Sequence, residues 1–163
     1  MRITREGMFE RTDIWREGKW LDLWSVVHFL TGASVGLGLY FLNFGALAAV
    51  SVALIGLTAY EMWEKIVGIE ETPTNRFMDV VVGMASFLPA FFLLAPVLSS
   101  TRIILAFGLV LTANIVMSVF GWLASQKAAE LEKRMRARYL IERARLLERR
   151  TRLQKRFLGQ KTR

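Results

Sequence analysis

Four long runs of apolar residues dominate the chain and restrict the folds that it can adopt. They cover residues 24–42, 46–67, 77–98 and 103–124, and three of the four carry almost no charge. A helix needs about 20 predominantly apolar residues to cross the hydrocarbon core of a membrane. The runs are continuous rather than alternating, which argues against membrane-spanning strands. We therefore predict an all-α fold built on a four-helix transmembrane bundle.

Charged residues are concentrated at the two ends of the chain. Residues 1–23 hold basic and acidic side chains in equal number, whereas residues 125–163 are strongly basic and account for the net charge of +8. This last segment has no Pro, has no Gly before Gly159, and is rich in residues that favour helices. We predict three parts: an N-terminal segment over 1–23, the bundle over 24–124, and a basic helical tail over 125–163. The absence of Cys excludes disulfides and thiolate metal sites.

The basic residues also predict how the chain is oriented. With four spans, both termini and the connection at residues 68–76 lie on one side of the membrane. Every Lys and Arg except Arg102 lies on that side. The positive-inside rule then places the N-terminus and the C-terminus in the cytoplasm. The five Trp residues fall at or near the same interface, as an aromatic belt would.

Four ionisable residues within the spans are candidate functional residues, because such groups are costly inside a membrane. They are His28, Glu61, Glu64 and Asp79. All four lie toward the cytoplasmic ends of their predicted helices. They therefore share a depth, and we predict that they converge on one polar pocket facing the cytoplasm. Tyr60 and Asn75 are expected to support them.

Helical spacing predicts which side of each helix faces inward. Each ionisable residue shares a helix face with small residues, which allow helices to approach closely in membranes. The predicted inward faces are His28 with Ser25, Gly32 and Gly36, Ala53 with Gly56, Tyr60 and Glu64, and Asp79 with Gly83 and Ser86.

Less specific interpretations exist for these residues. Asp79 in the first turn of the predicted span 77–98 could be a helix cap. His28 could bond to a backbone carbonyl, and Glu64 could pair with Lys65 or reach the headgroups.

If the pocket forms, its oxygen-rich ligands suit Mg²⁺, Mn²⁺ or Ca²⁺. It could equally hold protons, an amine or a lipid headgroup.

Residues 22–86 resemble a family of small bacterial inner-membrane proteins, the YjdF-like group, which is itself similar to the VanZ-like proteins. The resemblance lies in Asp22, His28-Phe29 and Gly32, then Ala59-Tyr60-Glu61-Met62-Trp63-Glu64, and finally Asp79 with Gly83. It implies a multi-pass protein of the bacterial inner membrane in which His28, Glu61, Glu64 and Asp79 belong together. It implies no reaction. A similarity to small bacterial diacylglycerol kinases is thinner, because Met78 precedes Asp79 where those enzymes have Lys.

The basic tail has three competing interpretations. It could be a solvated helix that fixes the topology, it could adsorb to anionic lipid, or it could dock to an acidic protein or to ribosomal RNA. The candidate contact residues are Lys133, Arg134, Arg136, Arg138, Arg143, Arg145, Arg149, Arg150 and Arg152. Few aromatic residues accompany them, which weakens the case for nucleic acid.

The function predicted from these features is binding of a cation or a polar lipid headgroup in the intramembrane pocket. One alternative is an accessory or structural subunit of a larger membrane complex or a homo-oligomer, docked through the tail. A second alternative is a lipid-modifying enzyme. The sequence does not decide whether the protein is an enzyme.

Overall fold

The structure is a computed structural model that describes residues 2–3, 9–10, 20–67 and 72–161. The chain divides into two compact units. One unit comprises Ile14–Ser125, and the other comprises Met1–Asp13 with Gln126–Arg163. We describe each unit by itself.

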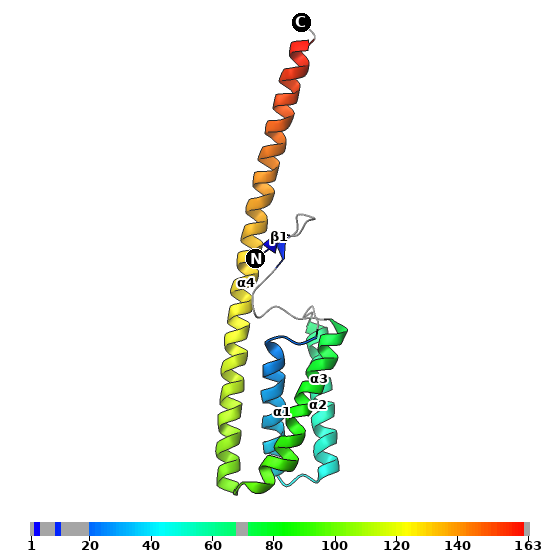
Figure 1. Cartoon of the computed structure of the whole chain (residues 1–163), viewed down its shortest axis with the longest axis vertical. Coiled ribbons are helices and arrows are strands. Elements are labelled where there is room, and N and C mark those ends of the chain that lie inside the picture. The colour runs from blue at the N-terminus through cyan, green and yellow to red at the C-terminus, as the bar shows by residue number, and fades with distance from the viewer. Residues whose placement is uncertain (1, 4–8, 11–19, 68–71, 162–163) are drawn as a thin grey trace. The chain divides into compact units, whose positions relative to one another are not determined.

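Four α-helices account for most of the described residues (Figure 1). They are α1 (Trp24–Phe41), α2 (Ala46–Val67), α3 (Pro73–Pro89) and α4 (Ser100–Lys161). All four are long and apolar enough to cross a membrane, α3 together with the turns that follow it up to Val97. The predicted all-α architecture with four candidate membrane spans is confirmed, and the bounds of α2 agree with the predicted span 46–67.

The outward surfaces of α1, α2, α3 and the first part of α4, up to Leu123, are mainly apolar. Leu47 on α2 is 84% exposed and Leu109 on α4 is 73% exposed, and large apolar side chains are exposed on α1 and α3 as well. A soluble helical protein buries one apolar stripe per helix and keeps the opposite face polar. Helices that are apolar all round and lie at the surface are typical of a protein whose solvent is lipid.

A compact turn joins α1 to α2, as the break at Asn43 and Gly45 predicted. Asn43 has a φ of 59°, in the left-handed region. Its N–H donates to the Tyr40 carbonyl at 2.9 Å, and the Phe44 N–H donates to the Leu39 carbonyl at 3.0 Å. This pair of bonds is a Schellman motif, which satisfies carbonyls at the end of α1 and reverses the chain.

The start of α3 differs from the predicted start at residue 77. The helix begins at Pro73, and the hydroxyl of Thr72 caps it by accepting from the Asn75 N–H at 3.2 Å. Pro is favoured at the first position of a helix because its fixed φ suits the helix and its missing N–H is not needed there. Pro73 therefore starts the helix, four residues before the predicted start of the span.

The end of α3 also differs from the predicted uninterrupted helix. A π-helical turn over Ala90–Leu94 and a 3₁₀ turn over Ala95–Val97 follow Pro89. Pro89 and Pro96 have no N–H to donate, so two backbone hydrogen bonds of an α-helix are missing within eight residues. The backbone accommodates these losses by changing its helical pitch.

Helices α1 and α3 form the most extensive helix contact of the bundle. A Cβ atom on Gly32 would collide with the Gly83 carbonyl oxygen and the Ser86 hydroxyl, so only Gly fits at this crossing. The Ser86 hydroxyl donates to the Phe29 carbonyl at 2.6 Å across the same contact. The predicted inward faces of α1 and α3 are confirmed, because Ser25, His28, Gly32 and Gly36, and likewise Asp79, Gly83 and Ser86, are buried.

The predicted inward face of α2 is confirmed for Ala53 and wrong for Gly56 and Tyr60. Its buried residues are Ala49, Ala53, Leu57 and Glu61, whereas Gly56 and Tyr60 are exposed. The helix is rotated because Leu57 packs against Gly83, where a Cβ would come within 2.8 Å of the leucine Cδ1. The small residue that makes room for α2 is thus on α3 and not on α2 itself.

The unit formed by the chain ends contains a short antiparallel pair of strands, which the sequence did not lead us to expect. It joins β1 (Arg2–Ile3) to β2 (Phe9–Glu10), with Arg2 opposite Glu10. The tail is helical up to Lys161, as predicted. Ion pairs one turn apart join Glu130 to Arg134, Glu132 to Arg136 and Glu148 to Arg152 along it.

The glycine crossing generates a stability prediction. Gly32→Ala should lower the free energy of unfolding by about 1–3 kcal/mol, because the added methyl group forces α1 away from α3. Gly56→Ala is the matched control, since a Cβ there meets nothing within 4 Å. Thermal unfolding in detergent should show a lower midpoint for the first variant and an unchanged or higher one for the second. Equal midpoints would contradict the packing described.

Candidate functional site

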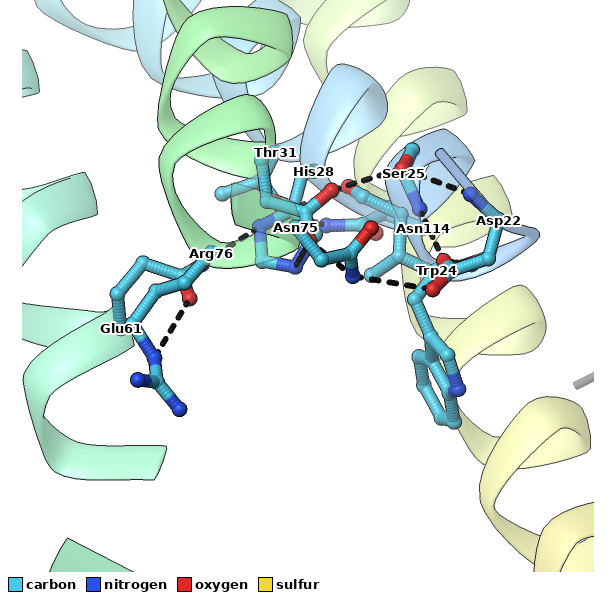
Figure 2. Close-up of polar contacts among 11 residues, drawn as sticks. Asp22, Trp24, Ser25, His28, Thr31, Glu61, Asn75, Arg76 and Asn114 are labelled. Atoms are coloured by element: carbon cyan, nitrogen blue, oxygen red, sulfur yellow. Dashed lines mark hydrogen bonds and ion pairs between the residues drawn. The ribbon is translucent and has the colours of Figure 1, made fainter. Parts of the chain in front are cut away.

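Three buried ionisable side chains from three helices meet at one end of the bundle (Figure 2). His28 comes from α1, Glu61 from α2 and Asp79 from α3. The imidazole Nδ1 lies 3.4 Å from Glu61 Oε1, and Nε2 lies 3.9 Å from Asp79 Oδ2. The imidazole therefore lies between two carboxylates, and the predicted convergence of these three residues is observed.

The three residues lie at matching depths. His28 follows the start of α1 by four residues, or about 6 Å along the axis. Glu61 precedes the end of α2 by six residues, and Asp79 follows the start of α3 by six, each about 9 Å. Because α1 and α3 begin at the end of the bundle where α2 finishes, the side chains meet a short distance inside that end.

Two further side chains orient the carboxylate of Asp79. The Ser25 hydroxyl donates to Asp79 Oδ1 at 2.8 Å, and the Asn75 amide donates to Oδ2 at 3.2 Å. Asp79 and Asn75 are fully buried. Ser25 precedes His28 by one turn on α1, and Asn75 precedes Asp79 by one turn on α3. The carboxylate is therefore held from both helices, with Oδ2 on the side of the imidazole.

Asp22 extends this network to the start of α1. Its Oδ1 accepts from the N–H groups of Trp24 at 2.8 Å and Ser25 at 3.2 Å, which caps the helix. Its Oδ2 accepts from the same Asn75 amide nitrogen at 3.1 Å. Asn75 thus bridges two carboxylates and ties the cap of α1 to the first turns of α3, as Figure 2 shows.

Arg76 and Tyr60 border the cluster on the side of α2. Arg76 Nε lies 3.9 Å from Glu61 Oε2, and the guanidinium extends away from the cluster in Figure 2. The Tyr60 ring meets the His28 ring edge-on, with centroids 5.8 Å apart. Tyr60 and Asn75 thus contact residues of the cluster, and their supporting role remains a prediction.

Some sequence interpretations of these residues change. Asp79 is not a cap of α3, because the helix starts six residues earlier and Thr72 caps it. His28 lies between carboxylates instead of bonding only to the backbone. Glu64 is half-buried and is not part of the ligand group, so its role remains a prediction.

Sequence reasoning did not count Asp22, Ser25 and Arg76 among the site residues, although it placed Ser25 on the inward face of the first span and Asp22 in the family pattern. The pair Thr72-Pro73 was the available signal, since a cap residue followed by Pro marks a helix start. A helix starting there brings Arg76 into its first turns and puts Asn75 one turn before Asp79.

The ligand group is compatible with a metal ion. The candidate ligand atoms of His28, Glu61 and Asp79 lie within 4.8 Å of one another. Ligands on opposite sides of Ca²⁺ stand about 5 Å apart, and those on opposite sides of Mg²⁺ about 4.2 Å, from the usual bond lengths. A large ion could be held with little movement, and a small one with a contraction of about 0.6 Å.

The candidate tail residues belong to the other compact unit, and their role remains a prediction. All nine, from Lys133 to Arg152, are exposed on α4.

Comparison of the chain with models of known protein families, with curated proteins and with solved structures finds no match.

Two serines on α1 test the network around Asp79. Ser25→Ala removes a hydrogen bond to a buried carboxylate and should lower the free energy of unfolding by about 1.5–3 kcal/mol. Ser34→Ala is the control, because the Ser34 hydroxyl is equally buried but has no hydrogen-bond partner among the described residues. Loss of the Ser34 hydroxyl should leave the free energy of unfolding unchanged or raise it. Chemical or thermal unfolding in detergent measures both, and equal losses would argue against the network.

Proposed function

We propose that this protein is a four-span membrane protein that binds a divalent cation between His28, Glu61 and Asp79. The observation that carries the proposal is the meeting of one imidazole and two carboxylates, all buried, from three separate helices. Ionisable groups inside membrane bundles are rare and generally mark a functional site. The supporting hydrogen bonds from Ser25 and Asn75 to Asp79 are of the kind that orients metal ligands.

The carboxylates of the cluster also favour a bound cation. Its contacts join three carboxylates, from Asp22, Glu61 and Asp79, with one guanidinium and one imidazole. Carboxylate oxygens are favoured ligands of divalent cations, so a cation bound at this position would make favourable contacts in the folded state.

The ligand types narrow the choice of ion. Two carboxylates suit Mg²⁺, Ca²⁺ and Mn²⁺, and an imidazole favours the transition metals. Mn²⁺ satisfies both preferences and is the most informative probe, with Mg²⁺, Ca²⁺ and Zn²⁺ as comparisons.

Titration of the purified full-length protein with Mn²⁺ tests the proposal. At a free concentration 100 times the dissociation constant, binding should stabilise the folded state by about 2.7 kcal/mol. Thermal unfolding would report this as a rise in the midpoint, and electron paramagnetic resonance would report the loss of the free-ion signal.

Two glutamates one turn apart on α2 provide the matched pair for this test. Glu61→Gln removes a ligand and should weaken Mn²⁺ binding by more than about 100-fold, because even loss of a supporting residue costs metal sites 10–100-fold. Glu64→Gln removes the same charge outside the ligand group and should bind nearly as the unchanged protein does. The proposal fails if no divalent ion shifts the midpoint, or if both variants bind alike.

We further propose that the protein resides in a bacterial inner membrane with both termini in the cytoplasm. The basic residues support this orientation, since all but Arg102 fall on the side of the termini. The metal site would then face the cytoplasmic leaflet, because it lies where α1 and α3 begin and α2 ends.

Single cysteines can test the orientation, because the chain has none of its own. Gly45→Cys places a thiol in the turn between α1 and α2, where an added side chain meets nothing within 4 Å. Gln126→Cys places one at the start of the tail. A membrane-impermeant maleimide should label the first variant in intact cells and the second only after lysis. The reverse pattern would place the termini outside.

A further inference from the structure

The proposed cation site leaves room for a ligand on the metal. The ligand group of the described residues offers one nitrogen and two carboxylates, each able to give one atom. Divalent ions take at least four ligands, and Mg²⁺ or Mn²⁺ usually six. Three bonds from the protein therefore leave one to three positions for water or for an oxygen of another molecule.

Arg76 adds a second feature that recognises an anion. It lies 3.9 Å from the metal ligand Glu61, and its side chain is 16% exposed. It precedes Asp79 by three residues, so it lies about 4.5 Å closer to the start of α3. A guanidinium presents N–H donors in a planar fork that matches two oxygens of a phosphate. A divalent cation beside a guanidinium is the combination by which proteins stabilise phosphoryl groups.

Exposed aromatic rings show from which side such an anion would come. Tyr60 contacts the His28 ring and is 46% exposed, and Trp63, one turn further along α2, is 55% exposed. Their ring centroids are 6.0 Å apart. Tyr and Trp on the surface of membrane helices favour the level of the lipid headgroups. The cluster lies about 6–9 Å inside the helix ends, next to a headgroup region about 5–7 Å thick.

From these three features we propose that the bound cation holds a phosphate group, clamped by Arg76 and supplied by the headgroup of an anionic phospholipid. The inference rests on the proposed cation site. It names the ligand class of that site: a phosphate ester on an acyl-chain anchor, with Tyr60 and Trp63 beside the lipid.

The experiment uses full-length protein in detergent, with and without Mn²⁺ and with three probes. Dioctanoyl phosphatidic acid carries phosphate and acyl chains, dioctanoylglycerol carries the chains alone, and inorganic phosphate carries the anion alone. We expect Mn²⁺ to tighten binding of the phosphatidic acid at least tenfold, and dioctanoylglycerol to show no such dependence on Mn²⁺. Bound Mn²⁺ should also broaden the ³¹P resonance of the lipid.

Arg76→Gln should weaken binding of the phosphatidic acid at least tenfold while Mn²⁺ affinity stays the same or rises, because a positive charge next to the metal is removed. Arg76→Lys keeps the charge without the fork and should recover binding only in part. Lys65→Gln, which removes an exposed cation from the last turns of α2, is the control and should bind both the metal and the lipid normally. If an Arg76 variant fails to fold, broadening of the ³¹P resonance by Mn²⁺ in the unchanged protein still tests whether the lipid phosphate lies beside the metal.

The outcomes separate this inference from the proposed function. If Mn²⁺ does not bind, both fail. If Mn²⁺ binds but no phosphate probe depends on it, the phosphate inference is overturned and the cation site stands. If inorganic phosphate binds as tightly as the lipid, the phosphate chemistry is supported but the lipid source is overturned in favour of a free anion.

Discussion

The close approach of α1 and α3 is the constraint on which the rest of the structure depends. Gly32 on α1 lacks the side chain that would collide with the backbone of α3 at Gly83, and the Ser86 hydroxyl donates across the contact to the Phe29 carbonyl. Membrane helices gain no hydrophobic energy by associating, so close packing and interhelical hydrogen bonds must hold them together. One turn away from this crossing, the same geometry brings His28 within reach of Asp79.

The polar cluster extends this contact to a third helix. Glu61 reaches the imidazole from α2, and the Asn75 amide joins the carboxylates of Asp22 and Asp79. Each charged group is costly in a low-dielectric interior and is tolerated because neighbours compensate for part of its charge. The imidazole and the two carboxylates that this arrangement brings together are the ligands of the proposed cation site. In the proposed lipid complex, Arg76 and the exposed pair Tyr60 and Trp63 would lie on the side of the headgroup.

Part of the site was predictable from residue types and spacing. His28, Asp79 and their small neighbours follow helical periodicity on α1 and α3, and the buried faces observed are those predicted. On α2 the same reasoning chose the face of Gly56 and Glu64, and the structure buries Glu61 with Leu57 instead. Both faces contain small residues and a glutamate, so local pattern could not separate them. The choice depends on the cavity that Gly83 offers to Leu57, which belongs to a different helix.

The sequence by itself determined the number of candidate spans, the helical tail and the turn at Asn43, because hydrophobic length and left-handed turn residues are local properties of the chain. It also identified which ionisable residues are costly. The tertiary structure alone decided the rotation of α2, the membership of Asp22, Ser25 and Arg76 in the cluster, and the π-helical end of α3. These features depend on contacts between residues far apart in the chain, or on how a backbone relaxes around missing donors, and neither is encoded in a local pattern.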